Sequence, residues 1–292
     1  MGLMKPAPFD YVRPSSVEEA CRVLAEAGGG ATVIAGGQTL MPLLALRMSQ
    51  PFVLVDINGI AALKGVTRVE GGIRVGPATR QADALRDATL ARHLPVFVTA
   101  LGHVGHYQTR NRGTVGGSIA LGEPAAEMPA TAVALGARVE IASVRGTRTV
   151  PADEFYLGPY MTVLEPDELV TGVVYPDWPD GHLVLFREVA QRPGDFALVG
   201  LVGALVLEGG TVSRAGIGWF GMGPTPIRAR QVEAALVGTA LDRIDPQTMA
   251  RLAIADTAPF DDHHASAEYR RTVGARIFAR ALAETLDLRS AA

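Results

Sequence analysis

A pair of adjacent glycines near the N-terminus is the feature of this sequence best suited to binding a ligand. The loop Ala35–Leu40 reads Ala-Gly-Gly-Gln-Thr-Leu and joins an apolar run, 31–34, to an apolar helical stretch, 40–47. Glycines at a strand end allow positive φ angles and place bare backbone N–H groups against a ligand, and a helix start adds further donors. A phosphate is the ligand that best suits such a loop, although a glycine pair alone is more often only a tight turn.

A second glycine pair follows about eighty residues later, in the segment Thr114–Ser118 (Thr-Val-Gly-Gly-Ser). Both segments also carry hydroxyl groups, on Thr39 in the first and at both ends of the second. Two N–H-rich loops from separate subdomains could hold the two halves of one pyrophosphate and bury a dinucleotide between them. Arg110 and Arg112 flank the second segment, and the sequence leaves open whether they bind this ligand or belong to a solvated, ion-paired turn.

A third glycine motif, Gly216–Gly221, matches the pattern G-x-G-x-x-G by its letters. A dinucleotide-binding fingerprint needs a helix that opens directly on the motif within a βαβ unit. Here Pro224 and Pro226 intervene, and the side chains of Trp219 and Phe220 would crowd a pyrophosphate. We therefore expect no nucleotide at this motif.

Composition indicates an ordinary globular protein with room for two or three compact units: 292 residues, 48% of them hydrophobic, with a formal net charge of −3. Bulk charge favours neither a nucleic-acid nor a membrane partner. Cys21 is the one cysteine, so the chain by itself cannot ligate an iron–sulfur cluster. The N-terminus lacks an apolar signal core, and the longest apolar stretch, 196–207, is too short to span a bilayer. We expect a cytoplasmic protein without an integral membrane segment.

The first part of the chain predicts two α/β units that carry one glycine segment each. Ser16 and Glu19 form a capping box that opens a helix, which the glycines at 28–30 close. Together with strands at 31–34 and 52–56 and the helix 40–47, this helix makes a small β/α unit over residues 5–57. The second unit, 58–175, has strands predicted at 73–76, 138–142 and 168–175 and helices at 80–87, 95–104 and about 125–135.

The turn-rich stretch 176–181 indicates a domain boundary. Beyond it lie three β-like runs and then three helical stretches, a succession typical of an antiparallel sheet followed by helices. The runs are 182–190, 196–207 and 211–219, and the helical stretches are 227–237, 246–256 and 266–286. The predicted class is α+β, with one domain over 1–176 (subdomains about 1–57 and 58–176) and a second over 177–292.

Four stretches of the sequence resemble one known family. They are Ala35–Leu43 with Leu46-Arg47, Thr109–Ser118, Phe9–Pro14 and Phe186–Ala197. Together they are similar to the FAD-binding medium subunit of the molybdenum-containing hydroxylases, the group of carbon monoxide dehydrogenase and xanthine dehydrogenase. The similarity covers essentially the whole chain. It implies a two-lobed PCMH-type FAD-binding domain, followed by a C-terminal domain of the carbon monoxide dehydrogenase flavoprotein type.

The resemblance also implies which residues bind FAD. The two glycine segments contact the pyrophosphate in the family, which here means Ala35, Gly36, Gly37, Gln38, Thr39 and Leu40 in the first and Thr114, Val115, Gly116, Gly117 and Ser118 in the second. Glu123 and Glu127 stand where relatives often carry aspartates that contact the adenosine part. Val170, Arg187 and Asp195 match positions that approach the flavin ring, with Arg187 in place of a lysine seen in xanthine dehydrogenases.

The sequence shows no paired nucleophile and base and no metal-ligand cluster, so we expect no acid–base catalytic residue and no metal ligand in this chain. The resemblance implies that a large subunit oxidises the substrate at a molybdopterin-type molybdenum cofactor. Electrons then cross two [2Fe–2S] clusters of a small subunit, reach FAD in this chain and leave to an external acceptor. The implied assembly is a heterohexamer, a dimer of heterotrimers.

Two other classes of function compete with this one. One is a self-contained flavin-dependent oxidase or dehydrogenase of the vanillyl-alcohol-oxidase-like fold, for which the C-terminal unit of about 110 residues looks too small. The other is a non-enzymatic scaffold that has lost FAD, against which the intact glycine segments argue.

Overall fold

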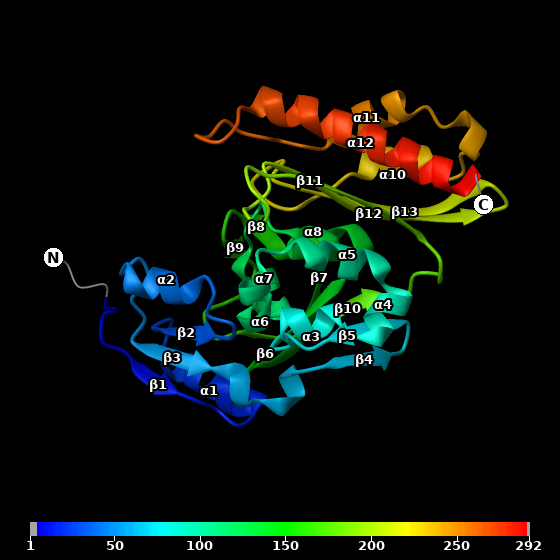
Figure 1. The fold of residues 1–292 in the computed structure, drawn as a ribbon. Helices are drawn as coiled ribbons and strands as arrows, with labels where there is room; N and C mark the ends of the chain where they lie inside the picture. The colour runs from blue at the N-terminus through cyan, green and yellow to red at the C-terminus, as the bar shows by residue number, and fades with distance from the viewer. Residues whose placement is uncertain (1–4, 291–292) are drawn as a thin grey trace.

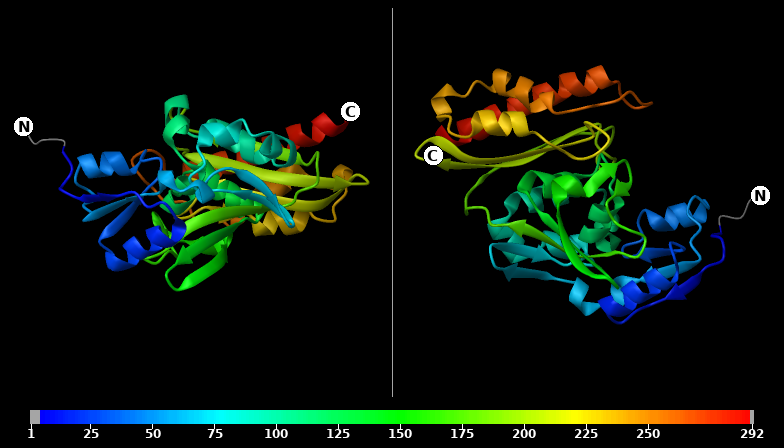
Figure 2. Two further views of the ribbon diagram at one scale, coloured as in Figure 1. Left: turned by 90° about the horizontal axis from the view of Figure 1, so that it is seen from below. Right: turned by 180° about the vertical axis from the view of Figure 1, so that it is seen from behind.

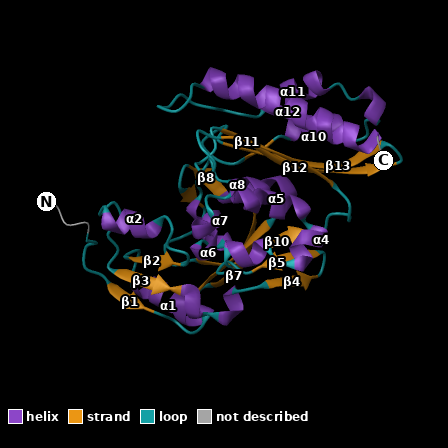
Figure 3. Ribbon diagram, viewed as in Figure 1, coloured by secondary structure: helices purple, strands orange, loops and turns teal. Residues whose placement is uncertain are grey.

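The computed structural model describes residues 5–290 and has three parts in chain order (Figure 1). A small N-terminal lobe packs beside a central part built on a five-stranded sheet, and a four-stranded sheet backed by helices forms the third part. Figure 3 shows that helices and strands are mixed throughout the first two parts, whereas the last helices lie together on one side. The predicted mixed α+β class and the two-lobed domain with its C-terminal sheet are confirmed.

The N-terminal lobe is a three-stranded parallel sheet in the order β1-β3-β2, with α1 and α2 packed around it. Its elements are β1 (Asp10–Val12), α1 (Val17–Glu26), β2 (Ala31–Ile34), α2 (Leu40–Ala45) and β3 (Val53–Asp56). Ser16 caps α1 and accepts a hydrogen bond from the Glu19 amide at 3.1 Å, while the Glu19 carboxylate accepts from the amide and hydroxyl of Ser15. The first glycine loop leaves the carboxyl end of β2, the edge at which parallel sheets bind ligands.

The central part carries an antiparallel sheet in the order β4-β5-β10-β6-β7. The strands are β4 (Val66–Val69), β5 (Gly72–Val75), β6 (Arg138–Ser143), β7 (Gly146–Pro151) and β10 (Leu169–Pro176), and a short hairpin joins β8 (Tyr156–Gly158) to β9 (Met161–Thr162). The helices are α3 (Gln81–Leu85), α4 (Ala88–His93), α5 (Pro95–His103), α6 (Tyr107–Arg112), α7 (Val115–Leu121), α8 (Glu127–Leu135) and α9 (Ala152–Phe155). Every residue of α8 is buried, so this helix is the apolar centre of the molecule.

The C-terminal sheet runs β11-β12-β13-β14 and is antiparallel throughout. Its strands are β11 (Leu183–Val189), β12 (Val199–Glu208), β13 (Thr211–Phe220) and β14 (Ile227–Arg228), and its helices are α10 (Arg230–Leu236), α11 (Pro246–Ala255) and α12 (Ala267–Ser290). The helices cover the face turned away from α8, as the right view of Figure 2 shows. The sheet is thus packed on both faces.

The third glycine motif, Gly216–Gly221, begins on β13, and its glycines have a role in packing. A Cβ atom at Gly216 would lie 2.3 Å from the Ala134 carbonyl oxygen, and one at Gly218 would lie 2.7 Å from that of Ala130. Both glycines let β13 approach α8 closely. These glycines therefore serve the packing of α8 on the sheet. This role explains the motif without a nucleotide.

Two stretches before and within the second glycine segment differ from the prediction. Tyr107–Arg112 forms α6 where no helix was expected, and Val115–Ser118 is the first turn of α7, not a loop. Thr114 caps α7 with its side-chain oxygen, a preferred role of threonine. Because both helices are only one or two turns long, their hydrophobic periodicity is too short to read from sequence.

Candidate cofactor site

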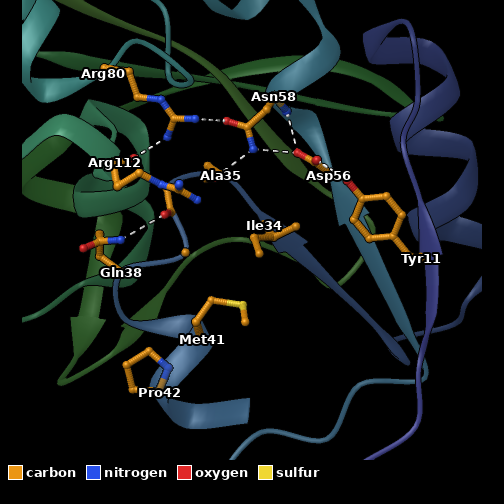
Figure 4. A pocket seen from close by; sticks show the side chains of 12 residues that line it. Tyr11, Ile34, Ala35, Gln38, Met41, Pro42, Asp56, Asn58, Arg80 and Arg112 are labelled. Atoms are coloured by element: carbon orange, nitrogen blue, oxygen red, sulfur yellow. Dashed lines mark hydrogen bonds between the residues drawn. The ribbon is translucent and has the colours of Figure 1, made fainter. Parts of the chain in front are cut away.

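A cavity of about 410 Å³ lies where the N-terminal lobe meets the central part (Figure 4). Its walls combine backbone of the first glycine loop, polar side chains from β1 and from the end of β3, and two arginines from the central part. The lining residues are Tyr11, Ile34, Ala35, Gly36, Gly37, Gln38, Met41, Pro42, Asp56, Asn58, Arg80 and Arg112.

The first glycine loop presents free backbone donors. Gly37 has a φ of 69°, a left-handed conformation that glycine adopts without strain. Within residues 5–290, none of the amide N–H groups of Gly36, Gly37, Gln38 and Thr39 donates a hydrogen bond. The Gln38 side chain instead turns back and donates to the Gly36 carbonyl at 3.4 Å. Successive free amides of this kind form a concave donor set that fits an anionic group.

The second glycine segment is different, because its amides are already used inside the protein. Val115 donates to the Thr79 carbonyl at 3.0 Å and Gly116 to the Pro77 carbonyl at 2.9 Å. Gly117 donates to the Thr114 hydroxyl at 3.1 Å, and Ser118 donates to the Thr114 carbonyl at 3.2 Å. The expectation of a bare N–H loop at 114–118 is therefore corrected. What the segment leaves accessible is the exposed Gly117 and the half-buried Ser118.

The two segments nevertheless lie against each other. A Cβ atom at Gly36 would be 2.6 Å from the Arg112 carbonyl oxygen and 2.8 Å from the Gly113 Cα. The Gly113 carbonyl in turn accepts from the Gln81 amide at 2.9 Å. Backbones from the two lobes thus touch at the cavity, and only glycine at position 36 permits this approach.

Side chains at the carboxyl edge of the parallel sheet complete the wall. The Asp56 carboxylate accepts hydrogen bonds from the Tyr11 hydroxyl, from the Asn58 amide at 2.9 Å and from Asn58 Nδ2 at 2.6 Å. Burial raises the pKa of Asp56, but the bonds from Tyr11 and Asn58 outweigh it and lower the pKa. Asp56 therefore stays ionised and acts as an acceptor that fixes its neighbours.

The two arginines before the second segment have separate roles. Arg110 donates to the Val104 and Gly105 carbonyls at 2.9 and 3.0 Å and so closes the preceding turn. Arg112 lines the cavity, and in the described part of the chain its guanidinium makes no hydrogen bond or ion pair. Burial and the nearby Arg112 charge lower the pKa of Arg80. An anion in the cavity would relieve this repulsion.

The two expected adenosine contacts lie outside the lining of this cavity. Glu123 is buried and accepts from the Ala125 amide at 3.0 Å and from the Tyr160 hydroxyl. Glu127 begins α8 and is 4% exposed. Burial raises the pKa of Glu127 to about 8, with a further increase from Glu188, so its surroundings favour the protonated carboxyl.

The three positions expected near the flavin ring are likewise absent from the cavity lining. Val170 is a buried residue of the central core on β10. Arg187, on β11, donates to the Phe186 carbonyl at 2.7 Å and pairs with Glu284 of α12. Asp195 pairs with Arg192 at 3.0 Å. Each of these polar side chains already has a partner, so a role toward a ring remains a prediction.

Sequence reasoning missed four polar residues of the wall: Tyr11, Asp56, Asn58 and Arg80. A signal was available for two of them. Asp56 ends the predicted buried strand 52–56 and Asn58 follows it, at the same sheet edge as the first glycine loop. Arg80 carries no such signal, because its approach to Asn58 depends on how the two lobes pack.

Free amides, a glycine in the left-handed conformation and an unpaired guanidinium around one cavity fit a phosphate-bearing cofactor. Fold and site thus define a protein with two α/β lobes and, between them, a cavity whose lining suits such a cofactor. Across residues 5–290, no helix is long and apolar enough to cross a membrane. The same residues contain no group of three His, Cys, Asp or Glu side chains placed to hold a metal ion.

Comparison with known proteins identifies the cofactor. The family described as the FAD binding domain in molybdopterin dehydrogenase matches residues 7–178, and the carbon monoxide dehydrogenase flavoprotein C-terminal domain matches residues 184–285. The alpha subunit of the 6-hydroxypseudooxynicotine dehydrogenase complex of Paenarthrobacter nicotinovorans is 39% identical over 97% of this chain and 96% of its own. The medium chain of carbon monoxide dehydrogenase of Hydrogenophaga pseudoflava is 34% identical over 96% of this chain and 97% of its own.

The solved structures agree with the sequence relatives. Carbon monoxide dehydrogenase from Hydrogenophaga pseudoflava, in a form that lacks the Mo-pyranopterin moiety of the molybdenum cofactor, superposes with a TM-score of 0.92 at 35% identity. The match covers 96% of this chain and 98% of that one. The chain belongs to this family: it is an FAD-binding medium subunit of the molybdenum hydroxylases, and thus an oxidoreductase flavoprotein. The family resemblance read from the four sequence stretches is confirmed.

Proposed function

We propose that this chain carries electrons through FAD, from the [2Fe–2S] clusters of a partner subunit to an external acceptor. The observation that supports the proposal best is the cavity between the lobes, where free amides of the first glycine loop and the unpaired Arg112 face one space. Bound FAD supplies the redox chemistry, so the protein has to hold it, orient it and control its surroundings.

Each part of the site has a proposed task toward the cofactor. Amides of the first glycine loop bind the diphosphate, with Arg112 as the neutralising charge. Gly117 and Ser118 approach it from the central part, and Val115 and Gly116 support them through their bonds to Thr79 and Pro77. The remaining proposed contacts are Glu123 and Glu127 toward the adenosine and Val170, Arg187 and Asp195 toward the ring.

The proposed partners are a large subunit with a molybdopterin-type cofactor and a small subunit with two [2Fe–2S] clusters, in a dimer of heterotrimers. The relatives are named as a medium chain and as one subunit of a dehydrogenase complex, which supports a multi-subunit assembly. Since their named substrates range from a nicotine derivative to carbon monoxide, the substrate is a property of the large subunit.

The test compares the isolated full chain with the co-expressed complex. We expect the isolated chain to bind about one FAD, seen by its absorbance, and to contain no iron or molybdenum. The complex should contain all three, and its flavin should be reduced after substrate is added. An isolated chain without affinity for FAD, or one that oxidises substrates by itself, would contradict the proposal.

A further inference from the structure

One side chain connects the two lobes at the cofactor cavity. We propose that Arg80 is a positioning residue, which sets the gap between the first glycine loop and the segment beginning at Arg112 before FAD binds. This inference rests on the proposed FAD site and adds to it a residue that does not itself bind the cofactor. Figure 4 shows the guanidinium of Arg80 between Asn58 and the backbone of Arg112.

The connection consists of three hydrogen bonds in series. Arg80 Nη1 donates to the Arg112 carbonyl, and Arg80 Nη2 donates to Asn58 Oδ1 at 2.8 Å. Asn58 Nδ2 donates to the Ala35 carbonyl at 2.8 Å. One planar guanidinium thus joins the residue before Gly36 to the residue before Gly113. These are the two points between which the backbones of the lobes touch.

Both ends of this connection are themselves held in place. Asn58 Nδ2 also donates to Asp56 Oδ1 at 2.6 Å, and Tyr11 donates to the other oxygen of the same carboxylate. A flipped Asn58 amide would place its oxygen against two acceptors and its nitrogen against a donor, so the observed orientation is the one with every group paired. On the other side, the Gln81 amide holds the Gly113 carbonyl at 2.9 Å.

Arg80 and Arg112 have different roles: Arg80 fixes the geometry of the two lobes, and Arg112 supplies a free positive charge. Both terminal nitrogens of Arg80 already donate to the protein, whereas the Arg112 guanidinium has no partner among residues 5–290. Arg112 can therefore turn toward a diphosphate, while Arg80 cannot turn without breaking the bonds that join the two lobes. A lysine keeps the positive charge but lacks the rigid fork that reaches two acceptors at a fixed spacing.

The experiment exploits this difference between charge and fork. FAD is titrated into the deflavinated full chain for the wild type, Arg80→Lys, Arg80→Gln and Asn58→Ala, with affinity and release rate followed by flavin fluorescence. Arg86→Lys is the matched control, since Arg86 is an exposed neighbour that pairs with Asp83 at 2.9 Å. Thermal unfolding of each apo chain measures any general loss of stability.

We expect all three variants to weaken FAD binding by about 10- to 100-fold, the range for losing a hydrogen bond to a charged group, while the control binds as the wild type does. The double variant Arg80→Gln with Asn58→Ala should be no weaker than the weaker single variant, because both changes break one connection. Normal FAD affinity in Arg80→Lys would overturn the positioning role, because it would show that only the positive charge at position 80 matters. Additive losses, or losses proportional to apo instability, would overturn it as well. A wild-type chain that binds no FAD would instead refute the proposed function.

Discussion

The two glycine segments share a sequence pattern but use their backbones in opposite ways. In the first, the amides of Gly36 to Thr39 have no acceptor within residues 5–290. In the second, the amides of Val115 to Ser118 all donate to other protein groups. A glycine pair therefore does not define a ligand loop by itself. What decides is whether neighbouring carbonyls already occupy its donors.

Glycine is also needed for different reasons in the two segments. At Gly116 a Cβ would lie 2.1 Å from the Pro77 side chain, so this glycine permits packing inside the central part. At Gly37 the nearest atom to a Cβ is Met41 Cγ at 3.2 Å, and the positive φ is the main constraint. The first glycine pair leaves free amides at the cavity, and the second belongs to the packed protein behind it.

The largest effect is expected for Gly116→Val, which tests the packing role. The new side chain would overlap the backbone and ring of Pro77, and overpacking of this kind costs about 1–3 kcal/mol or more. Urea denaturation of the apo chain should show a clearly lower midpoint or no folded protein. A Gly116→Val chain of normal stability that fails to bind FAD would contradict the packing role and indicate that Gly116 acts on the cofactor instead.

Gly37→Val tests the first loop. A β-branched residue is strongly disfavoured at a φ of 69°, and relaxing the strain would turn the free amides away from the cavity. We expect FAD retention to be lost while the other elements of the apo chain stay folded, as seen by circular dichroism and flavin absorbance. Normal flavin content would remove the first loop from the site.

Glu127→Gln tests whether the region behind the second segment is packed protein. Burial raises the pKa of Glu127 to about 8 from 4.5, so between these values the unfolded carboxyl is ionised while the folded one stays protonated. Wild-type stability should fall as pH rises through this window, by on the order of 5 kcal/mol from this group. Glu188, whose pKa burial raises to about 7, adds a slope of the same sign.

The glutamine variant should show a flatter stability curve from pH 4.5 to 8, measured by urea unfolding of the apo chain. An unchanged slope would mean that Glu127 is solvated and that this wall is open.

The smallest effect separates the two arginines that precede the second segment. Arg112→Gln should weaken FAD binding about tenfold and reduce its salt dependence, because the free charge at the cavity is lost. Arg110→Gln should lower apo stability by about 1–2 kcal/mol through its lost bonds to two carbonyls, with an unchanged salt dependence. Equal salt dependence in both variants would show that Arg112 does not face the diphosphate.

Much of the fold was accessible from local signals. The strand 31–34, the capped helix after Ser16 and the three C-terminal β runs appear at or within a few residues of their predicted bounds. These elements have clear periodicity, caps or bounding turns, which act over short stretches of chain. The resemblance to the family and its cofactor also followed from sequence alone and is confirmed.

The tertiary structure decided how the predicted groups are used. Whether the amides of 114–118 are free depends on Pro77 and Thr79, which lie far back in the sequence, and the pairing of Arg80 with Asn58 depends on two lobes meeting. Glycine pairs, caps and periodicity are properties of neighbouring residues, so the chain itself encodes them legibly. Hydrogen-bond satisfaction and close backbone approach depend on distant residues. For that reason only the folded molecule distinguishes the glycine segment with free amides from the one whose amides are already bonded.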